Sequence, residues 1–590
     1  MSNIIELNDV SFSYAPGAPR ALSHVTLDIP TGSFTGIIGP SGAGKSTLAN
    51  VLCGAIPHHF TGELFGATYV DGQDTCEITL TDIARIIGHV NQDIDAQMVA
   101  SVVEDELLFG LENFGVPHQH IEKFITAALD AVGIADLRDR EIATLSGGQK
   151  QKVAIAAILA LAPRVLVMDE PTAALDPVSS RMVFEVLRDL NRDEGITVVV
   201  IEQKVALLSE FCDRIVVMDG GRTVLSGTPH EVFGHAEELR EIGVDSPRTA
   251  RISNSLAAAG LCPAEPPALS VDEAAELVEG ILREQGTRIA GSVRTAEAPA
   301  PAAPTTPAPR PHAAGAEPVL TFRGVSFAYP GGGASVNNLE LTVYPGELVG
   351  IIGQNGAGKT TATKLVNGLL KPASGTVTVA GLDTRTAPVS RIARHVATLF
   401  QNPDRQLCKN TVLDEVAFGL ELAGIDRAEA RRRAERVIER FGLPAEESPF
   451  SLSRGQRQMV ALASVVVVEP DIVVLDEPTS GLDYRECMTV METVREMAEH
   501  GCAVIIVCHD MEVVSDFAER LAVMADGCIL GAGATRDIFA DAALMERARV
   551  APPQVTALAE RLAREASPAF AHASEVADVV RTVKELVNRA

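Results

Sequence analysis

The amino-acid sequence predicts a duplicated α/β fold, in which each half is built around a parallel sheet with a phosphate-binding loop at the carboxyl end of a strand. Three observations predict it. Glycine-rich segments at 39–47 and 353–361 each follow an apolar strand pattern and lead into a helical pattern. Each half has an apolar run that ends in Asp-Glu, at 165–170 and 472–477. Landmarks of the two halves recur at offsets of 309, 307, 307 and 306 positions, which is typical of a duplicated domain and not of a solenoid repeat.

The composition argues against several classes of protein. The 590 residues carry a formal net charge of −28, so the surface repels phosphate backbones and a nucleic-acid partner is not expected. The chain lacks an apolar run of about 18 residues, the length that a membrane span requires. Its first residues also lack the basic and apolar blocks of a signal peptide. The nine cysteines form no C-x-x-C pair, which argues against zinc or iron–sulfur sites and suits a reducing cytoplasm.

Both glycine-rich segments match the phosphate-loop pattern G-x-x-x-x-G-K-[S/T]. Backbone N–H groups of such a loop surround phosphate oxygens, and the following helix N-terminus adds partial positive charge. The lysines are expected to reach the β and γ phosphates, and the next hydroxyls to bind Mg²⁺. A tight strand-to-helix turn is the alternative. The predicted nucleotide-binding residues are Gly39, Ser41, Gly42, Gly44, Lys45, Ser46 and Thr47, and in the second half Gly353, Asn355, Gly356, Gly358, Lys359, Thr360 and Thr361.

Acidic residues and a second glycine motif complete the pattern. Asp169 and Asp476 end buried strands and can hold Mg²⁺, while Glu170 and Glu477 directly after them can polarise water. Upstream of each acidic pair, a Ser-x-Gly-Gln segment opens a helix whose N-terminus can bind an anion, although a simple helix cap is the alternative. These predicted contacts are Ser146, Gly147, Gly148 and Gln149, and in the second half Ser453, Gly455 and Gln456, with Arg454 in place of a glycine.

The order of phosphate loop, Gln, Ser-Gly-Gly-Gln, Asp-Glu and then His resembles the nucleotide-binding domains of ATP-binding-cassette (ABC) proteins. It occurs twice, across almost the whole chain outside a linker. The resemblance implies an ATPase that uses ATP and Mg²⁺, with a parallel-sheet core, a β subdomain and a helical subdomain in each half. It also implies that the two halves pair around two ATP molecules, each held by one half's phosphate loop and the other half's Ser-Gly-Gly-Gln helix.

Four further residues gain a role from the same resemblance. Gln92 and Gln401 match the glutamine that joins the Mg²⁺ ligands. Tyr14 and Tyr329 match the aromatic residue that stacks on adenine, with packing at a strand end as the alternative.

The predicted division of the chain has five parts. An Ala/Pro-rich linker is expected to be an extended tether that only raises the local concentration of the halves. The helical stripes on either side of it are expected to be core or dimer-contact faces. The parts are cassette 1 at 1–235, a helical extension at 236–290, the linker at 291–317, cassette 2 at 318–545 and a C-terminal helical extension at 546–590.

A narrower resemblance concerns the segments 92–97 and 401–406, each followed by an acidic, apolar helix with Phe109 or Phe418 near its end. These segments are similar to the energy-coupling-factor importers of vitamins, cobalt and nickel. In that family the segment forms a groove for the coupling helices of a membrane subunit.

This resemblance implies the ATP-hydrolysing energy-coupling subunit of an importer, at the cytoplasmic face of the cell membrane. It would drive uptake of a vitamin or a transition-metal ion through a separate transmembrane coupling subunit and a substrate-binding membrane component. The alternative is a soluble tandem-cassette translation factor that acts on the ribosome. Such factors join their cassettes by a long basic helical arm, whereas this joint is Ala/Pro-rich and the chain is acidic.

The two halves differ in one catalytic position. In the ABC family a histidine after the last core strand contacts the γ phosphate and the attacking water. The second half has His509, whereas the first has Gln203, which cannot become cationic. By the implied pairing, the site on Lys45 combines Gln203 with the Arg454 helix, and the site on Lys359 combines His509 with the intact motif. We therefore expect unequal sites, with the second as the principal hydrolytic one.

Overall fold

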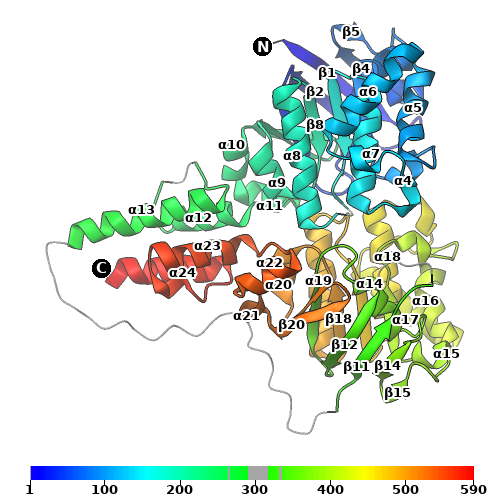
Figure 1. Cartoon of the computed structure of the whole chain (residues 1–590), viewed down its shortest axis with the longest axis vertical. Helices are drawn as coiled ribbons and strands as arrows, with labels where there is room; N and C mark the ends of the chain where they lie inside the picture. Colours follow the sequence, from blue (N-terminus) through cyan, green and yellow to red (C-terminus); the bar gives the residue numbers. More distant parts are fainter. Residues whose placement is uncertain (1, 174, 264–265, 290–316, 331–334, 590) are drawn as a thin grey trace. The chain divides into compact units, whose positions relative to one another are not determined.

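The computed structural model describes residues 2–173, 175–263, 266–289, 317–330 and 335–589. The chain divides into two compact units, Met1–Ser270 and Val271–Ala590, each described here by itself. Each unit contains one four-stranded antiparallel sheet and one six-stranded, mostly parallel sheet with helices around it (Figure 1). The predicted fold class, two tandem α/β cassettes, is confirmed.

In the first unit the antiparallel sheet has the strand order β2-β1-β4-β5, and the larger sheet has the order β10-β9-β3-β8-β7-β6. All contacts of the larger sheet are parallel except that of the edge strand β10 with β9. The strands are β1 (Asn3–Ser13), β2 (Leu22–Pro30), β3 (Phe34–Ile38), β4 (Glu63–Val70), β5 (Gln73–Asp74), β6 (Ile87–Val90), β7 (Val165–Asp169), β8 (Thr197–Ile201), β9 (Arg214–Asp219) and β10 (Arg222–Gly227).

The helices of the first unit are α1 (Lys45–Leu52), α2 (Ala55–His58), α3 (Leu80–Ala84), α4 (Ile94–Gln97), α5 (Val103–Asn113), α6 (His118–Ala131), α7 (Gly147–Leu159), α8 (Pro177–Asp193), α9 (Val205–Phe211), α10 (Pro229–Gly234), α11 (Ala236–Ile242) and α12 (Arg248–Ala258).

The second unit repeats this topology, with the orders β12-β11-β14-β15 and β16-β17-β18-β13-β19-β20. Its strands are β11 (Leu320–Phe327), β12 (Val336–Val343), β13 (Leu348–Ile352), β14 (Ser374–Val379), β15 (Leu382–Asp383), β16 (Val396–Leu399), β17 (Ile472–Asp476), β18 (Ala503–Val507), β19 (Arg520–Ala525) and β20 (Cys528–Ala534). Its helices are α13 (Val271–Ile289), α14 (Lys359–Val366), α15 (Val389–Ile392), α16 (Val412–Leu422), α17 (Arg427–Arg440), α18 (Arg454–Val466), α19 (Tyr484–Glu499), α20 (Met511–Phe517), α21 (Thr535–Phe539), α22 (Ala542–Ala548), α23 (Gln554–Glu565) and α24 (Val576–Arg589).

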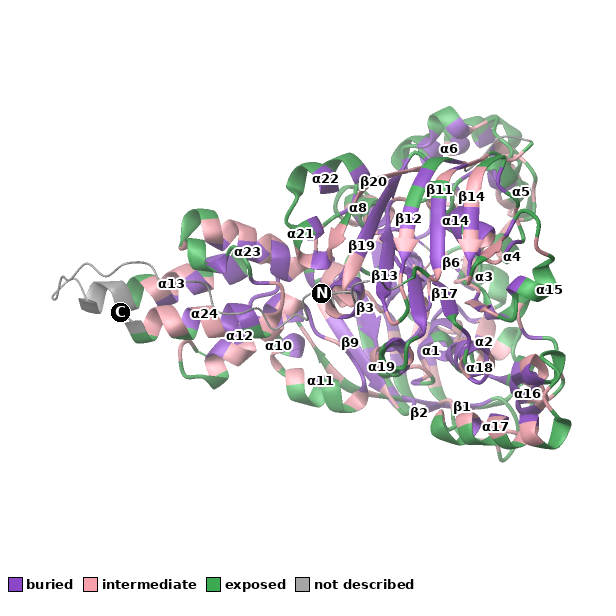
Figure 2. Ribbon diagram, turned by 90° about the horizontal axis from the view of Figure 1, so that it is seen from below, coloured by how far each residue is buried: buried purple, intermediate pink, exposed green. Residues whose placement is uncertain are grey.

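The parallel strands are buried on both faces, which explains why they read as continuous apolar runs (Figure 2). Alternate side chains of a strand point to opposite faces of its sheet. In β7, Val165 and Val167 therefore pack toward the antiparallel sheet and α1, whereas Leu166 and Met168 pack toward the helical layer. This double burial fixes the carboxyl ends of the strands, where the acidic pairs follow.

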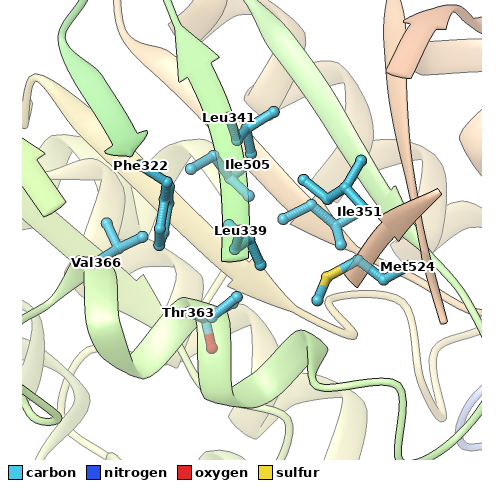
Figure 3. Close-up of a pocket in the computed structure, with 10 residues that line it drawn as sticks. Phe322, Leu339, Leu341, Ile351, Thr363, Val366, Ile505 and Met524 are labelled. Carbon is cyan, nitrogen blue, oxygen red and sulfur yellow. The ribbon is translucent and has the colours of Figure 1, made fainter. Parts of the chain in front are cut away.

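A small apolar cavity of about 10 Å³ lies between the two sheets of the second unit, beside the helix that follows the phosphate loop (Figure 3). Phe322 and Ala362 are among the residues that line it. Leu48 occupies the position of Ala362 in the first unit and is fully buried there, and Leu7 occupies the position of Phe322. The two cassettes thus divide similar side-chain volume differently between a strand and a helix.

Helix α13 packs against α23 and α24 within the second unit (Figure 1). Its buried face includes Ala274, Val278 and Ile281, and Arg561 of α23 forms an ion pair with Asp272. The apolar stripes before and after the predicted linker therefore form one helical layer, as a core interpretation requires. The linker itself lies outside the described residues except for residue 317.

Within the described parts of the chain, every helix is too short or too polar to cross a lipid bilayer.

Candidate functional site

The first phosphate loop connects β3 to α1. Lys45, the first residue of α1, is buried, and its Nζ donates hydrogen bonds to the carbonyl oxygens of Gly39 at 2.7 Å and Pro40 at 2.8 Å. Gly44 has a φ of 92°, and a Cβ atom there would lie 2.5 Å from the carbonyl oxygen of Ala21. Only glycine fits this left-handed, crowded position, so the sequence motif follows from the backbone geometry.

The second loop repeats this geometry between β13 and α14. Lys359 Nζ donates to the carbonyl oxygens of Gly353 at 2.6 Å and Gln354 at 3.0 Å. Gly358 has a φ of 98°, and a Cβ atom there would lie 2.8 Å from the carbonyl oxygen of Ser335. Each unit therefore holds an ammonium group inside a loop at a helix N-terminus, as a phosphate site requires.

The acidic pair of the first unit lies beside its loop, although about 120 residues separate them in sequence, because β7 and β3 both flank β8. Asp169 is buried and hydrogen-bonds to Ser46, and burial raises the pKa of its carboxyl group. Gln92 donates its Nε2 to Glu170 Oε2 at 2.5 Å, which leaves its own oxygen for another partner. A carboxylate, a hydroxyl and an amide oxygen are hard donors that fit Mg²⁺ bound together with phosphates.

Glu170 receives a second hydrogen bond, from Gln203 Nε2 to its Oε1 at 2.9 Å. It adopts a left-handed backbone conformation, with a φ of 48°, which is uncommon outside glycine and typical of functional positions. Burial, together with the nearby charges of Glu202 and Asp169, raises the pKa of its carboxyl group to about 6.

The second unit has the same arrangement with a different partner. Gln401 Nε2 donates to Glu477 Oε2 at 2.7 Å, and His509 Nε2 lies 2.9 Å from Glu477 Oε1. Glu477 also has a left-handed φ, of 51°. Burial raises the pKa of Glu477, but the hydrogen bond from His509 and its charge outweigh burial, so the pKa lies below its usual value.

The predicted metal-binding pair of the second unit is Asp476 and Thr360, which hydrogen-bond to each other. Burial and then the charge of Glu477 raise the pKa of Asp476 to about 6. A bound divalent cation would oppose both effects, so this buried acid fits a Mg²⁺ ligand.

Both Ser-x-Gly-Gln segments form capping boxes. In α7 the hydroxyl of Ser146 accepts the backbone N–H of Gln149, whose side chain accepts the N–H of Ser146, and Ser453 and Gln456 do the same in α18. The simple helix-cap role is thus present in both units. Arg454 lies against Gly481 of its own unit. A Cβ atom added to that glycine would lie only 3.2 Å from Arg454 Nε. Binding of ATP by these segments stays a prediction.

The two tyrosines follow the ends of β1 and β11. Tyr14 Oη hydrogen-bonds with Thr47 Oγ1 at 3.1 Å, directly after the phosphate loop, and 46% of the residue is exposed. Tyr14 and Tyr329 also pack edge-on against Phe12 and Phe327, with ring centroids 4.9 and 5.0 Å apart. Strand-end packing is therefore present, and stacking on adenine stays a prediction.

Sequence reasoning missed a pair of buried acids, Glu106 and Glu415. The Glu106 carboxylate accepts the backbone N–H groups of residues 99 and 100, at 2.9 and 2.7 Å. Glu415 does the same for residues 408 and 409, both at 2.7 Å. Each acid fixes the segment that follows Gln92 or Gln401. Their separation of 309 positions equals that of the two glutamines, a signal that could have revealed them.

Comparison with known proteins agrees with this site. The family model "ABC transporter" matches residues 22–173 and 336–480. A protein of Caldanaerobacter subterraneus, provisionally named as an ABC transporter ATP-binding protein, is 35% identical over 574 residues, covering 95% of this chain and 96% of its own. A relative from Vibrio vulnificus with the same kind of name is 31% identical over 576 residues, covering 96% of each chain.

The solved structure of cbiO1 from Clostridium perfringens, described as part of the ABC transporter complex cbiONQ, is 32% identical. It covers 41% of this chain and 95% of its own with a TM-score of 0.37, too low to support an argument about function. The matches across both units, together with two complete phosphate-loop and acidic-pair sites, show that this chain belongs to the ABC transporter family, as an ATP-binding, ATP-hydrolysing protein with two tandem cassettes.

Proposed function

We propose that the chain is the energy-coupling ATPase of an importer, acting at the cytoplasmic face of the membrane. It drives uptake of a vitamin or transition-metal ion through a transmembrane coupling subunit and a substrate-binding membrane component. One observation carries the proposal. Val99, in the segment that Glu106 fixes, is 64% exposed, and Phe109 on the following helix, α5, is 47% exposed. A fixed, exposed apolar segment next to Gln92 suits the docking of a partner helix.

The second unit presents a different surface at the same place. Cys408 is exposed where the first unit has Val99, and Lys409 Nζ lies 3.6 Å from the ring centroid of Phe418. The two docking surfaces differ, since one is apolar and the other basic. They would therefore recognise different partner segments. This difference favours a membrane partner with two distinct coupling helices.

Ion pairs offer a route from docking to hydrolysis. Asp95 pairs with Lys150 of α7 at 2.6 Å, and Asp404 pairs with Arg457 of α18 at 2.9 Å. Both pairs connect the proposed docking segment to the helix that begins with the Ser-x-Gly-Gln motif. A movement of the docked partner would thus be passed to the helix proposed to contact ATP.

For the chemistry, we propose that Lys45 and Lys359 hold the phosphates and that Glu170 and Glu477 orient the attacking water. We assign Glu477 as the principal of the two because the imidazole of His509 contacts it, whereas Glu170 has the amide of Gln203 in that place. Mg²⁺, when bound, neutralises phosphate charge. Asp169 with Ser46 and Asp476 with Thr360 would hold it.

The test of the proposed function is co-purification from native membranes. We expect Val99→Asp combined with Phe109→Ala to abolish recovery of a transmembrane protein identified by mass spectrometry, while ATP binding persists. Phe65→Ala is the matched control, because Phe65 is 55% exposed on β4 of the antiparallel sheet. Unchanged recovery of the membrane protein by the double variant, or recovery of ribosomal RNA in place of any membrane protein, would contradict the proposal.

A further inference from the structure

The two units differ on both sides of the Gln203/His509 position. The first unit has Glu202 and Lys204 there, and the second has Cys508 and Asp510. These residues follow β8 and β18, which lie next to β7 and β17 in their sheets. They therefore face the loops that follow the acidic pairs.

In the first unit, Glu202 connects the loop that follows Glu170 to the residues that follow β8. Its side chain is buried, with only 2% of the residue exposed. One carboxylate oxygen accepts hydrogen bonds from Thr172 Oγ1 at 2.5 Å and from the Thr172 backbone N–H at 3.3 Å. The other accepts the backbone N–H groups of Gln203 at 2.9 Å and Lys204 at 3.4 Å. Four donors thus hold one carboxylate between the loop after Glu170 and the residue that contacts Glu170.

Lys204 adds a second link to the same loop. Its Nζ donates to the carbonyl oxygens of Thr172 at 2.8 Å and Leu175 at 3.1 Å, and to Ser180 Oγ at 2.8 Å. The long side chain therefore crosses from the start of α9 to the loop before α8.

In the second unit Cys508 takes the place of Glu202 with weaker contacts, and its Sγ accepts the backbone N–H of Asp510 at 3.3 Å. Asp510 accepts the backbone N–H groups of Glu512 and Val513 and so caps its own helix, α20. Cys508 Sγ lies 3.7 Å from Thr479 Oγ1, the counterpart of Thr172, a long contact to a weakly polar thiol. His509 itself contacts Glu477 with an aromatic ring that can carry positive charge.

We propose that Thr172, Glu202 and Lys204 are positioning residues of the first ATP site, which hold the Gln203 amide against Glu170. The physical reason is the identity of Gln203. A glutamine side chain is flexible and uncharged, so it gains no ionic attraction to Glu170 and has more conformations to lose than an imidazole. Anchoring its backbone and the loop after Glu170 to a single buried carboxylate removes that freedom. Beside His509 this anchor has only a weak counterpart, the thiol of Cys508.

The inference rests on the proposed role of Glu170, and the experiment separates the two. Single-turnover ATP hydrolysis is measured in the full-length chain carrying Glu477→Gln, so that the first site is observed. In that background Thr172→Val removes the hydroxyl at nearly constant shape. We expect the single-turnover rate constant to fall about tenfold with the half-saturating ATP concentration unchanged, since misplacement acts on the chemical step. Thr172→Ser is expected to restore the rate, and Lys204→Met to lower it similarly.

The matched control is Thr479→Val in a chain carrying Glu170→Gln, where we expect less than a twofold change. Thermal melting of each variant tests that it is folded. Loss of hydrolysis on adding Glu170→Gln, with no effect of Thr172→Val, would overturn the positioning role while keeping that of Glu170. The positioning role would also be overturned if Thr172→Val and Thr479→Val had equal effects, or if Thr172→Ser failed to restore the rate. Absence of all hydrolysis in the Glu477→Gln parent would overturn it as well.

Discussion

The two cassettes hold their phosphate-loop lysines in nearly the same way but surround the acids proposed to be catalytic differently. Glu170 and Glu477 share a left-handed backbone and a glutamine donor at 2.5 and 2.7 Å. Beyond that, Glu170 lies near Gln203 and the buried charge of Glu202, and its pKa rises to about 6. Glu477 lies next to His509, and its pKa falls below the usual value. The two acids therefore share a backbone conformation but differ in pKa, because their neighbouring side chains differ.

The largest expected effect tests this inequality directly. Removing a water-orienting base costs about two to four powers of ten in rate, so Glu477→Gln should abolish most turnover and trap ATP. Glu170→Gln should reduce turnover less, because its site is the weaker one. Steady-state ATPase rates of both variants, with the membrane partner present, compare the sites. Equal losses, or a larger loss from Glu170→Gln, would refute the second site as the principal one.

Exchanging the Gln203 and His509 side chains should narrow the difference in hydrolysis rate between the two sites. His509→Gln removes the imidazole beside Glu477, and we expect turnover to fall about ten- to hundredfold, within the range of one catalytic group. Gln203→His is expected to raise turnover no more than about threefold, because Glu202 and Lys204 still define that site. ATPase rates at saturating ATP measure both. A loss of activity in Gln203→His as large as that in His509→Gln would show that the surroundings, and not the histidine, distinguish the cassettes.

Charge reversal tests the proposed coupling route on each side. We expect Asp95→Lys and Asp404→Lys to weaken assembly with the membrane subunit while ATP binding persists. Because exposed ion pairs contribute only about 0.2–1 kcal/mol, the melting temperature should hardly change. Pull-down of the partner measures assembly. Asp95→Lys with Lys150→Asp rebuilds the ion pair as a control, and full recovery of the partner by the single variants would contradict the role.

The smallest effect concerns the cavity of the second cassette. Ala362→Leu alone should destabilise that unit by about 1–3 kcal/mol through overpacking. The added leucine would meet Phe322, whereas the matching leucine of the first cassette faces the smaller Leu7. Adding Phe322→Leu conserves volume and should reduce the cost below about 1.5 kcal/mol. Calorimetric unfolding of the single and double variants measures the coupling. If the changes in unfolding free energy of the two single substitutions add up strictly in the double variant, the two positions do not share this space.

Local patterns predicted the duplicated fold and the centre of each site. The phosphate loops, the strand-ending acids and the glutamines each carry a signature within a few residues. Parallel strands present their carboxyl ends at one edge of a sheet, so residues that follow different strands can meet there. In the structure Gln92 and Gln203 both donate to Glu170, the residue after the end of β7.

Only the tertiary structure decided how each site is supported. Thr172 and Glu202 are 30 residues apart, and their contact exists because β7 and β8 are neighbours in the sheet. Similarly, α13 joins helices almost 300 residues later in the chain, because its apolar face needs a partner that local sequence does not specify. A buried carboxylate carries no local signature, since its meaning depends on which donors surround it after folding. The sequence thus determined which groups perform the chemistry, and long-range packing determined how firmly each is held.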